Sequence, residues 1–111
     1  MPDLGTDRFG HRVFYDPHHW QGHVLLRHPE VTGLEEELQQ AIATPTWIVE
    51  SGSRQAGHWE PLLVFFRVLD DSVLKVVVRP YSADKAFAVT AYLVAADSHK
   101  DSHTAPTDAP A

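Results

Sequence analysis

Apolar positions in the first half of the chain recur at three- and four-residue steps, which is the spacing of one helix face. Asp16 followed by Pro17 is typical of a helix start, with the aspartate as N-cap and the proline in the first turn. A short strand over residues 13–15 precedes it. The residues predicted to share one face of this first helix are Trp20, Val24 and Arg27, with His23 beside Trp20.

A second helix is predicted after the chain break at His28-Pro29. Thr32 and Glu35 have the spacing of a capping box, in which the threonine caps the helix and the glutamate reaches back. The helix is predicted to end at Thr44, because Pro45 disfavours helical backbone at the residue before it. The buried stripe is predicted to be Leu34, Leu38 and either Ala41 or Ile42, joined by Val31.

The second half of the chain has the pattern of strands. A short apolar run over residues 47–49 is followed by a loop rich in turn formers from Gly52 to Pro61. Three longer strands come next, separated by Asp70-Asp71-Ser72 and by a turn over residues 81–85. They are predicted over 62–69, 73–79 and 86–94, and two successive hairpins make an antiparallel meander.

These elements predict the α+β fold class, with two N-terminal helices packed on one face of a four-stranded antiparallel sheet. The chain has 111 residues, which suits one domain. We expect a flexible lead-in over residues 1–10, the domain over 11–95 and a disordered C-terminal tail over 96–111. The tail consists mainly of Ala, Asp, Ser, His, Thr and Pro, and such a segment cannot offset the entropy of ordering it.

Alternation along the strands sorts their residues into two faces. The face predicted to pack on the helices is apolar and comprises Leu62, Val64, Phe66 and Val68, then Leu74, Val76 and Val78, then Phe87, Val89, Ala91 and Leu93. The opposite face mixes aliphatic residues with cations, a hydroxyl and a phenol. Arg and Lys bind phosphate as a fork and as a point charge, and Thr and Tyr add further donors. This mixed face carries Arg67, Lys75, Arg79, Thr90 and Tyr92, and either binds phosphate or is an ordinary solvated face.

The composition limits the chemistry available to the chain. It has no cysteine, which excludes disulfides, thiolate nucleophiles and cysteine-ligated zinc. We see neither a signal peptide nor an apolar run that spans a bilayer, so we expect a cytoplasmic protein without a membrane partner. The net charge of −6 argues against a general nucleic-acid binder, although the sheet half is close to charge-balanced and a site is local.

Four of the eight histidines cluster around the first helix. His19 and His23 are four residues apart and could share a metal ion, but the chain lacks the acidic residue of an H-E-x-x-H motif. We therefore expect no metal and no cofactor. His23 is expected on the side of the helix that meets the sheet, either as a core residue or as a general acid or base.

The order of several short motifs resembles a known family. Residues 20–24 and 27–30 resemble the "W-x-H-I … R-H-P-E" opening of small phage- and actinobacterium-associated nuclease-like domains. These are grouped with barnase, EndoU, colicin tRNases and RelE as the BECR fold. Residues 65–67, 74–78 and 89–92 resemble the strand motifs "Y-F-Y-R", "L-K-V-V-V" and "V-V-T-A-Y". The opening here has one more residue between Trp20 and His23, which would rotate the histidine by about a hundred degrees.

The resemblance implies a toxin-like, metal-independent endoribonuclease. It implies that RNA, tRNA included, is the substrate, and that a cognate antitoxin or immunity protein is the partner. The family's helix histidine, strand cation and strand hydroxyl correspond to His23, Lys75 and Thr90, which would be catalytic. Arg67, Arg79 and Tyr92 would bind the substrate.

Two other hypotheses stay open. The first is a non-catalytic interaction module on the same scaffold, which would bind a protein through exposed Trp59 and Phe65. The second is a histidine-metal protein, which would need an acidic residue or His58 near His19 and His23.

Overall fold

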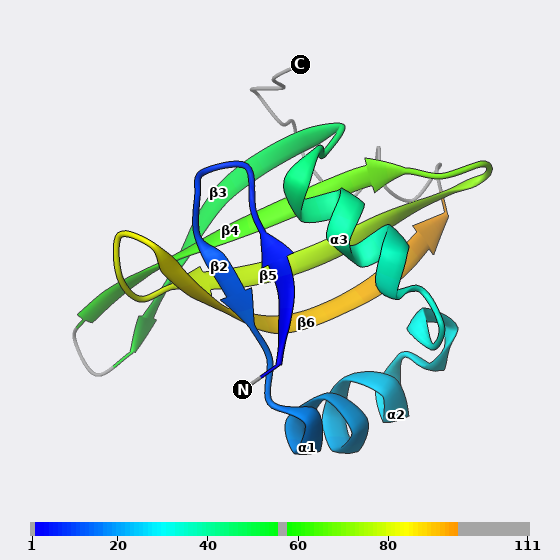
Figure 1. Ribbon diagram of the computed structural model, residues 1–111, viewed down its shortest axis with the longest axis horizontal. Helices are drawn as coiled ribbons and strands as arrows, with labels where there is room; N and C mark the ends of the chain where they lie inside the picture. The colour runs from blue at the N-terminus through cyan, green and yellow to red at the C-terminus, as the bar shows by residue number, and fades with distance from the viewer. Residues whose placement is uncertain (1, 56–57, 96–111) are drawn as a thin grey trace.

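A six-stranded mixed sheet forms the body of the protein, so the α+β class is confirmed (Figure 1). The computed structural model describes the backbone of residues 2–55 and 58–95 and the side chains of residues 2–51 and 61–95. The strands, in chain order, are β1 (Asp3–Thr6), β2 (Arg12–Phe14), β3 (Trp47–Gln55), β4 (His58–Val68), β5 (Ser72–Pro80) and β6 (Lys85–Ala95). The helical elements are α1 (Pro17–His19), the π-turn η1 (Trp20–Val24), α2 (Leu25–Arg27), the 3-10 turn η2 (Pro29–Val31) and α3 (Glu35–Ala43).

The sheet has the spatial order β1-β2-β6-β5-β4-β3. The predicted antiparallel meander from β4 to β6 is confirmed, and β3 adds a further hairpin to it, but the expected count of four strands is wrong because β1 and β2 extend the sheet. β2 pairs with β6 in parallel over residues 12–14 and 85–87, and antiparallel with β1. The predicted lead-in over residues 1–10 therefore contains a strand, and Leu4 of that strand is buried.

The predicted loop between Gly52 and Pro61 is largely strand. β3 continues to Gln55, and β4 begins at His58, where the two strands pair as a long hairpin. Turn-forming residues here do not stop the ladder, because a hairpin arm is held by its cross-strand partner more than by intrinsic propensity. The predicted tail over 96–111 lies outside the described residues.

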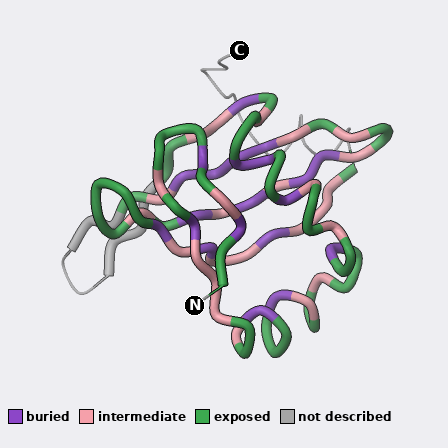
Figure 2. Tube along the Cα trace, viewed as in Figure 1, coloured by how far each residue is buried: buried purple, intermediate pink, exposed green. Residues whose placement is uncertain are grey.

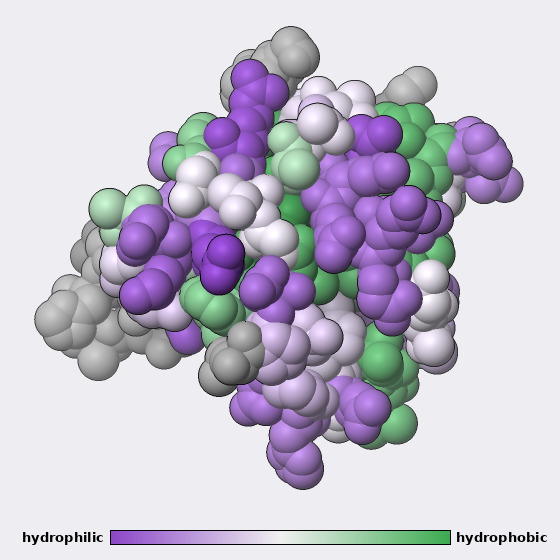
Figure 3. Space-filling view, in the orientation of Figure 1, coloured by the Kyte–Doolittle hydropathy of each residue, from purple (hydrophilic) through white to green (hydrophobic). Residues whose placement is uncertain are grey.

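The two predicted helices contact different strands of the sheet, although Trp20 and Val24 of the first and Leu38 of the second are buried in one core. α3 crosses one face and contacts β1, β4 and β5, whereas η1 and η2 contact β6 and lie along its edge (Figure 1). The first predicted helix consists of α1, η1 and α2 in succession, and the second is α3. Hydrophilic side chains gather over the outer side of α3 (Figure 3). Its inner side buries Leu38, Ala41 and Ile42, as the stripe predicted.

The two predicted helix starts have different outcomes. The Asp16 carboxylate accepts from the backbone N–H of His18 at 3.0 Å, so the predicted cap of the first helix is confirmed. The predicted capping box at Thr32 is wrong, because α3 begins at Glu35 with Leu34 in the cap position and without a side-chain cap. Gly33 explains the delay: its φ of +84° is left-handed, so the helix cannot run through it.

The main core lies between the sheet and the helices. Its buried members include Phe65, Leu74, Val76 and Val78 from the sheet, against Leu38 and Ile42 of α3 (Figure 2). Our assignment of the β4 faces is therefore reversed, since Leu63 and Phe65 face the helices. Both faces of β4 are apolar, so alternation alone could not orient it. The register does, because Phe66 lies opposite Lys75 while Phe65 lies opposite Val76.

The other sheet face has a smaller cluster of its own, made of Trp47, Val64, Phe66 and Val73. A bulge in β6 changes which residues reach the main core. Val77 pairs with Thr90 and Val78 with Ala88, so Val89 is the extra residue. Ala86 and Ala88, which precede the bulge, and Ala91, which follows it, are buried in the core. The predicted placing of Phe87 and Val89 in the core is therefore wrong.

Candidate functional site

A cleft of about 350 Å³ opens between β6 and the run of short helical turns from α1 to η2, residues 17–31, which we call the helical segment. We call this cleft the histidine cleft. It is lined from two parts of the chain that are far apart in the sequence, the helical segment and β6. Together they contribute three imidazoles, a guanidinium, a hydroxyl and a phenol. Its lining residues are His19, His23, Val24, Arg27, His28, Val89, Thr90 and Tyr92. Such a concentration of ionisable and hydrogen-bonding groups in one hollow is the usual mark of a candidate site.

The cleft exists because β2 is too short to cover β6. β2 pairs only with residues 85–87, and the helical segment borders the remaining edge of β6. Side chains from that segment take the place of a strand there. The His19 Nε2 lies 3.1 Å from the carbonyl oxygen of Val89, and the Glu30 carboxylate accepts from the N–H of Leu93 at 3.4 Å. Satisfying exposed backbone groups in this way protects a sheet edge.

The contact of His19 fixes its role. A carbonyl oxygen only accepts, so the Nε2 of His19 carries the proton in this bond. His19 therefore holds the helical segment to the bulge residue of β6. Its ring also stacks on that of His23, with 5.2 Å between the centroids and 29° between the planes. His19 thus places the imidazole of His23 against the cleft.

The π-turn η1 contains the residues that join Trp20 to His23. The N–H of Leu25 bonds to the carbonyl of Trp20, five residues back, so this turn holds one residue more than an α-helical turn. Trp20 is buried and packs on Tyr15, while His23 is exposed on the cleft side. The wider turn therefore joins a buried Trp20 to an exposed His23.

His28 forms the second imidazole wall of the cleft. Its ring stacks on Tyr92, with 4.9 Å between the centroids and 25° between the planes. The Glu30 carboxylate lies 3.6 Å from His28 Nδ1, which makes an ion pair when the imidazole is protonated. Both side chains are about a third exposed, so this pair orients the ring more than it stabilises the fold.

Lys75 lies beside the cleft rather than in its lining. Its Nζ is 5.1 Å from the ring centroid of Tyr92 and 5.6 Å from that of Phe66, which itself stacks on Trp47. These four residues are successive cross-strand partners, so they form one row across the sheet from β3 to β6. The ammonium is therefore held by cation–π contacts next to the phenol that lines the cleft.

The two predicted arginines lie elsewhere. Arg67 donates from Nη1 to the carbonyl of Thr44 at 2.6 Å and lines a different hollow, together with residues of α3. Arg79 is exposed and lies four residues along β5 from Lys75, which corresponds to about 13 Å of strand. The structure thus gathers His23, Thr90 and Tyr92, places Lys75 beside them and separates both arginines from them.

Sequence reasoning missed three lining residues, namely His19, Arg27 and His28. The signal was present, because Arg27 and His28 open the R-H-P-E stretch of the resemblance. In the sequence alone that stretch indicates a helix break and carries part of the resemblance, without assigning Arg27 or His28 to the site. Placing it in a site requires knowing that the helical segment runs along the edge of β6.

The rival hypotheses also have structural outcomes. Phe65 is fully buried, so its predicted place on an exposed docking surface is wrong, and the side chain of Trp59 lies outside the described residues. No group of three His, Asp or Glu side chains is placed to hold a metal ion within the described part of the chain, which leaves out His58. In the same residues, no helix has the length and apolar character needed to cross a membrane.

Comparison with known proteins does not identify a relative of this chain. No family model, no curated protein and no solved structure matches this chain.

Proposed function

We propose that the protein is a metal-independent ribonuclease of toxin or phage-defence type, with the histidine cleft as its active site. The observation that carries the proposal is the convergence of His23, His28 and Arg27 with Thr90 and Tyr92 around one hollow of about 350 Å³. An imidazole ordinarily exchanges its proton near neutral pH, so two of them can divide the work of a base and an acid.

The reaction needs few parts. A base removes the proton of a ribose 2′-hydroxyl, the oxygen attacks the adjacent phosphorus, and an acid protonates the departing 5′-oxygen. A cation stabilises the charge that develops on the phosphorane. His23 and His28 are the proposed base and acid, because each lines the cleft and neither ring is hydrogen-bonded to a described backbone group as His19 is. Kinetic measurements on the single variants would show which of the two imidazoles is the base and which is the acid.

Arg27 is the proposed phosphate ligand in place of Arg67 and Arg79. Its guanidinium lines the cleft and offers the fork that matches two phosphate oxygens. Thr90 supplies a hydroxyl from β6, and Tyr92 a phenol whose ring is stacked on His28. The Lys75 ammonium is in cation–π contact with the Tyr92 ring, so it adds positive charge beside the cleft and holds that ring in place.

The acidic balance of the chain is compatible with this proposal when few phosphates are bound. Among the described side chains, Arg27 and the neighbouring Lys75 bring full positive charge to the cleft, against a net charge of −6 for the whole chain. We therefore propose recognition of a short stretch of RNA, such as a loop of tRNA, rather than tracking along a backbone. A cognate antitoxin or immunity protein would act by covering the cleft.

The test is cleavage of total RNA, tRNA included, by the purified protein in EDTA across several pH values. His23→Ala and His28→Ala should each abolish cleavage while the circular dichroism spectrum stays unchanged. His18→Ala is the matched control, because His18 is exposed on the same helical segment and does not line the cleft. Absence of cleavage by the wild-type protein, or full activity in both cleft variants, would refute the proposal.

A further inference from the structure

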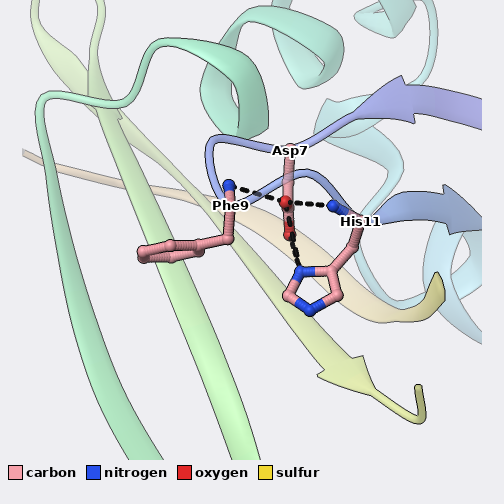
Figure 4. A network of polar contacts seen from close by, with 3 residues as sticks. All are labelled: Asp7, Phe9 and His11. Carbon is pink, nitrogen blue, oxygen red and sulfur yellow. Dashed lines mark hydrogen bonds and ion pairs between the residues drawn. The ribbon is translucent and has the colours of Figure 1, made fainter. Parts of the chain in front are cut away.

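A second candidate site lies at the tight turn between β1 and β2, on a different part of the molecule from the histidine cleft. The Asp7 side chain is fully buried there, although it is a carboxylate. Its oxygens accept from the backbone N–H groups of Phe9 and His11, both at 2.9 Å, and from Nδ1 of His11 at 2.9 Å (Figure 4). Three donors on one buried carboxylate make this turn a rigid support.

The support fixes the imidazole of His11. Because Nδ1 donates to the Asp7 carboxylate, the neutral ring has its lone pair on Nε2. Figure 4 shows Nε2 on the side of the ring that points away from Asp7. Among the described residues, Nε2 has no hydrogen-bond partner, so it is a pre-oriented acceptor. Neither the fold nor the proposed ribonuclease chemistry uses it.

His11 lines a hollow of about 290 Å³ that we call the turn pocket. Its walls are otherwise mainly apolar, and one carboxylate lies at its rim. The lining residues are Phe9, His11, Glu50, Pro61, Leu63 and Pro80. The Phe9 ring is half exposed and lies near those of His11 and Phe65, at centroid distances of 6.5 and 6.3 Å. The pocket therefore combines an imidazole fixed by Asp7 with an accessible aromatic ring.

The charge of the turn pocket is opposite to that of the histidine cleft. Glu50 is exposed and forms no ion pair with any described side chain, and among the residues whose side chains the structure describes neither Lys nor Arg lines the pocket. The Asp7 carboxylate lies directly behind His11. With a net charge of −6 on the chain, this local field favours a cation over an anion.

We propose that the turn pocket binds a planar organic cation, namely an amidinium or guanidinium group carried on an apolar body. The apolar walls take the body, and the ring of Phe9 offers its face to the delocalised charge. The Glu50 carboxylate accepts the paired N–H donors of the planar head as a fork. His11 Nε2 accepts one further N–H.

Three ligands of similar shape but different charge separate the contribution of charge to binding from that of shape. They are the cation benzamidine, its neutral amide analogue benzamide, and the anion benzoate. They are titrated into ¹⁵N-labelled protein, and binding is followed through the amide signals of residues 7–11. We expect millimolar binding of benzamidine, as suits so small a ligand. Benzamide should bind roughly fivefold more weakly and benzoate not measurably, because the charge pair is exposed and its gain is modest.

Glu50→Gln should weaken benzamidine binding by roughly the same fivefold, since it removes the charge and keeps the shape. Glu36→Gln is the matched control, because Glu36 is an exposed carboxylate on α3 outside the pocket. Equal binding of benzamidine and benzoate, shifts outside residues 7–11 and the pocket walls, or equal loss in both variants would overturn the proposal. So would an absence of shifts with benzamidine. None of these outcomes depends on ribonuclease activity.

Discussion

Replacing Asp7 by alanine should destabilise the protein far more than replacing an ordinary aspartate. The substitution leaves two backbone N–H groups and one imidazole N–H without their acceptor, and all three point at a carboxylate that is itself fully buried. An unsatisfied donor of this kind costs about 1–3 kcal/mol. Phe9 is half exposed and water can reach its N–H in part, so we take the lower end for each donor. The expected loss is about 3 kcal/mol.

The chain offers a matched control for this experiment. Asp3 makes the same local turn, with its carboxylate accepting from the N–H two residues on, Gly5, at 2.8 Å. That bond is exposed, so Asp3→Ala should cost about 0.5 kcal/mol. Asp7→Asn should fall between the two, because an amide oxygen can still accept from both backbone groups while the charge at His11 is lost.

Urea unfolding followed by tryptophan fluorescence measures these differences as shifts of the midpoint at constant slope. A loss of about 3 kcal/mol corresponds to a fall in melting temperature of roughly 12–24 °C for a domain of this size. If Asp7→Ala and Asp3→Ala lower the free energy of unfolding equally, the buried carboxylate does not hold the turn. The description of the turn pocket as a rigid support would then be wrong as well.

Three further predictions concern other parts of the molecule. Gly33→Ala should lower stability by about 1 kcal/mol, because φ is +84° there, whereas Gly22→Ala in the helical segment should be neutral or stabilising; thermal unfolding compares the two. Lys75→Met keeps the aliphatic contacts and removes the charge, so it should raise KM for RNA more than it lowers kcat, as steady-state kinetics would show. The logarithm of RNA affinity should fall against the logarithm of salt concentration with a slope of about −1.4, from two phosphate contacts on a single strand, and a slope beyond about −4 would contradict the short-stretch proposal.

Local signals in the sequence were sufficient wherever a single element decides the outcome. Asp16 caps the first helix because the cap depends only on its neighbours, and α3 buries the stripe that its spacing predicts. The meander from β4 to β6 follows from strand length and turn residues in the same way. Each of these predictions concerns residues that are close together in the chain.

Predictions that depended on pairing between distant segments were less successful. β1 contains a single large apolar residue, Leu4, so its sequence does not distinguish it from a loop until β2 pairs with it. The faces of β4 were reversed because both are apolar, and the bulge at Val89 changed the alternation of β6 without any signal in composition.

The candidate site shows the same division. Thr90 and Tyr92 could be assigned to the open face of β6, and His23 to the helix, by periodicity alone. That His19, Arg27 and His28 join them depends on how the helical segment lies against β6, which is a tertiary contact. Arg67 was placed wrongly together with the face of β4, so its guanidinium lies near Thr44 instead.

The parallel pairing of β2 with β6 has a consequence for the order in which the chain folds. Of the six strands of this sheet, β1 and β2 are synthesised before the others, but their neighbour β6 is synthesised after the others. The meander is built from contacts between adjacent strands, which form quickly because their loops are short. We therefore expect the meander and α3 to act as the folding nucleus, with the N-terminal hairpin docking late. Substitutions at Val13, which is fully buried between these two parts, should speed unfolding and leave the folding rate almost unchanged.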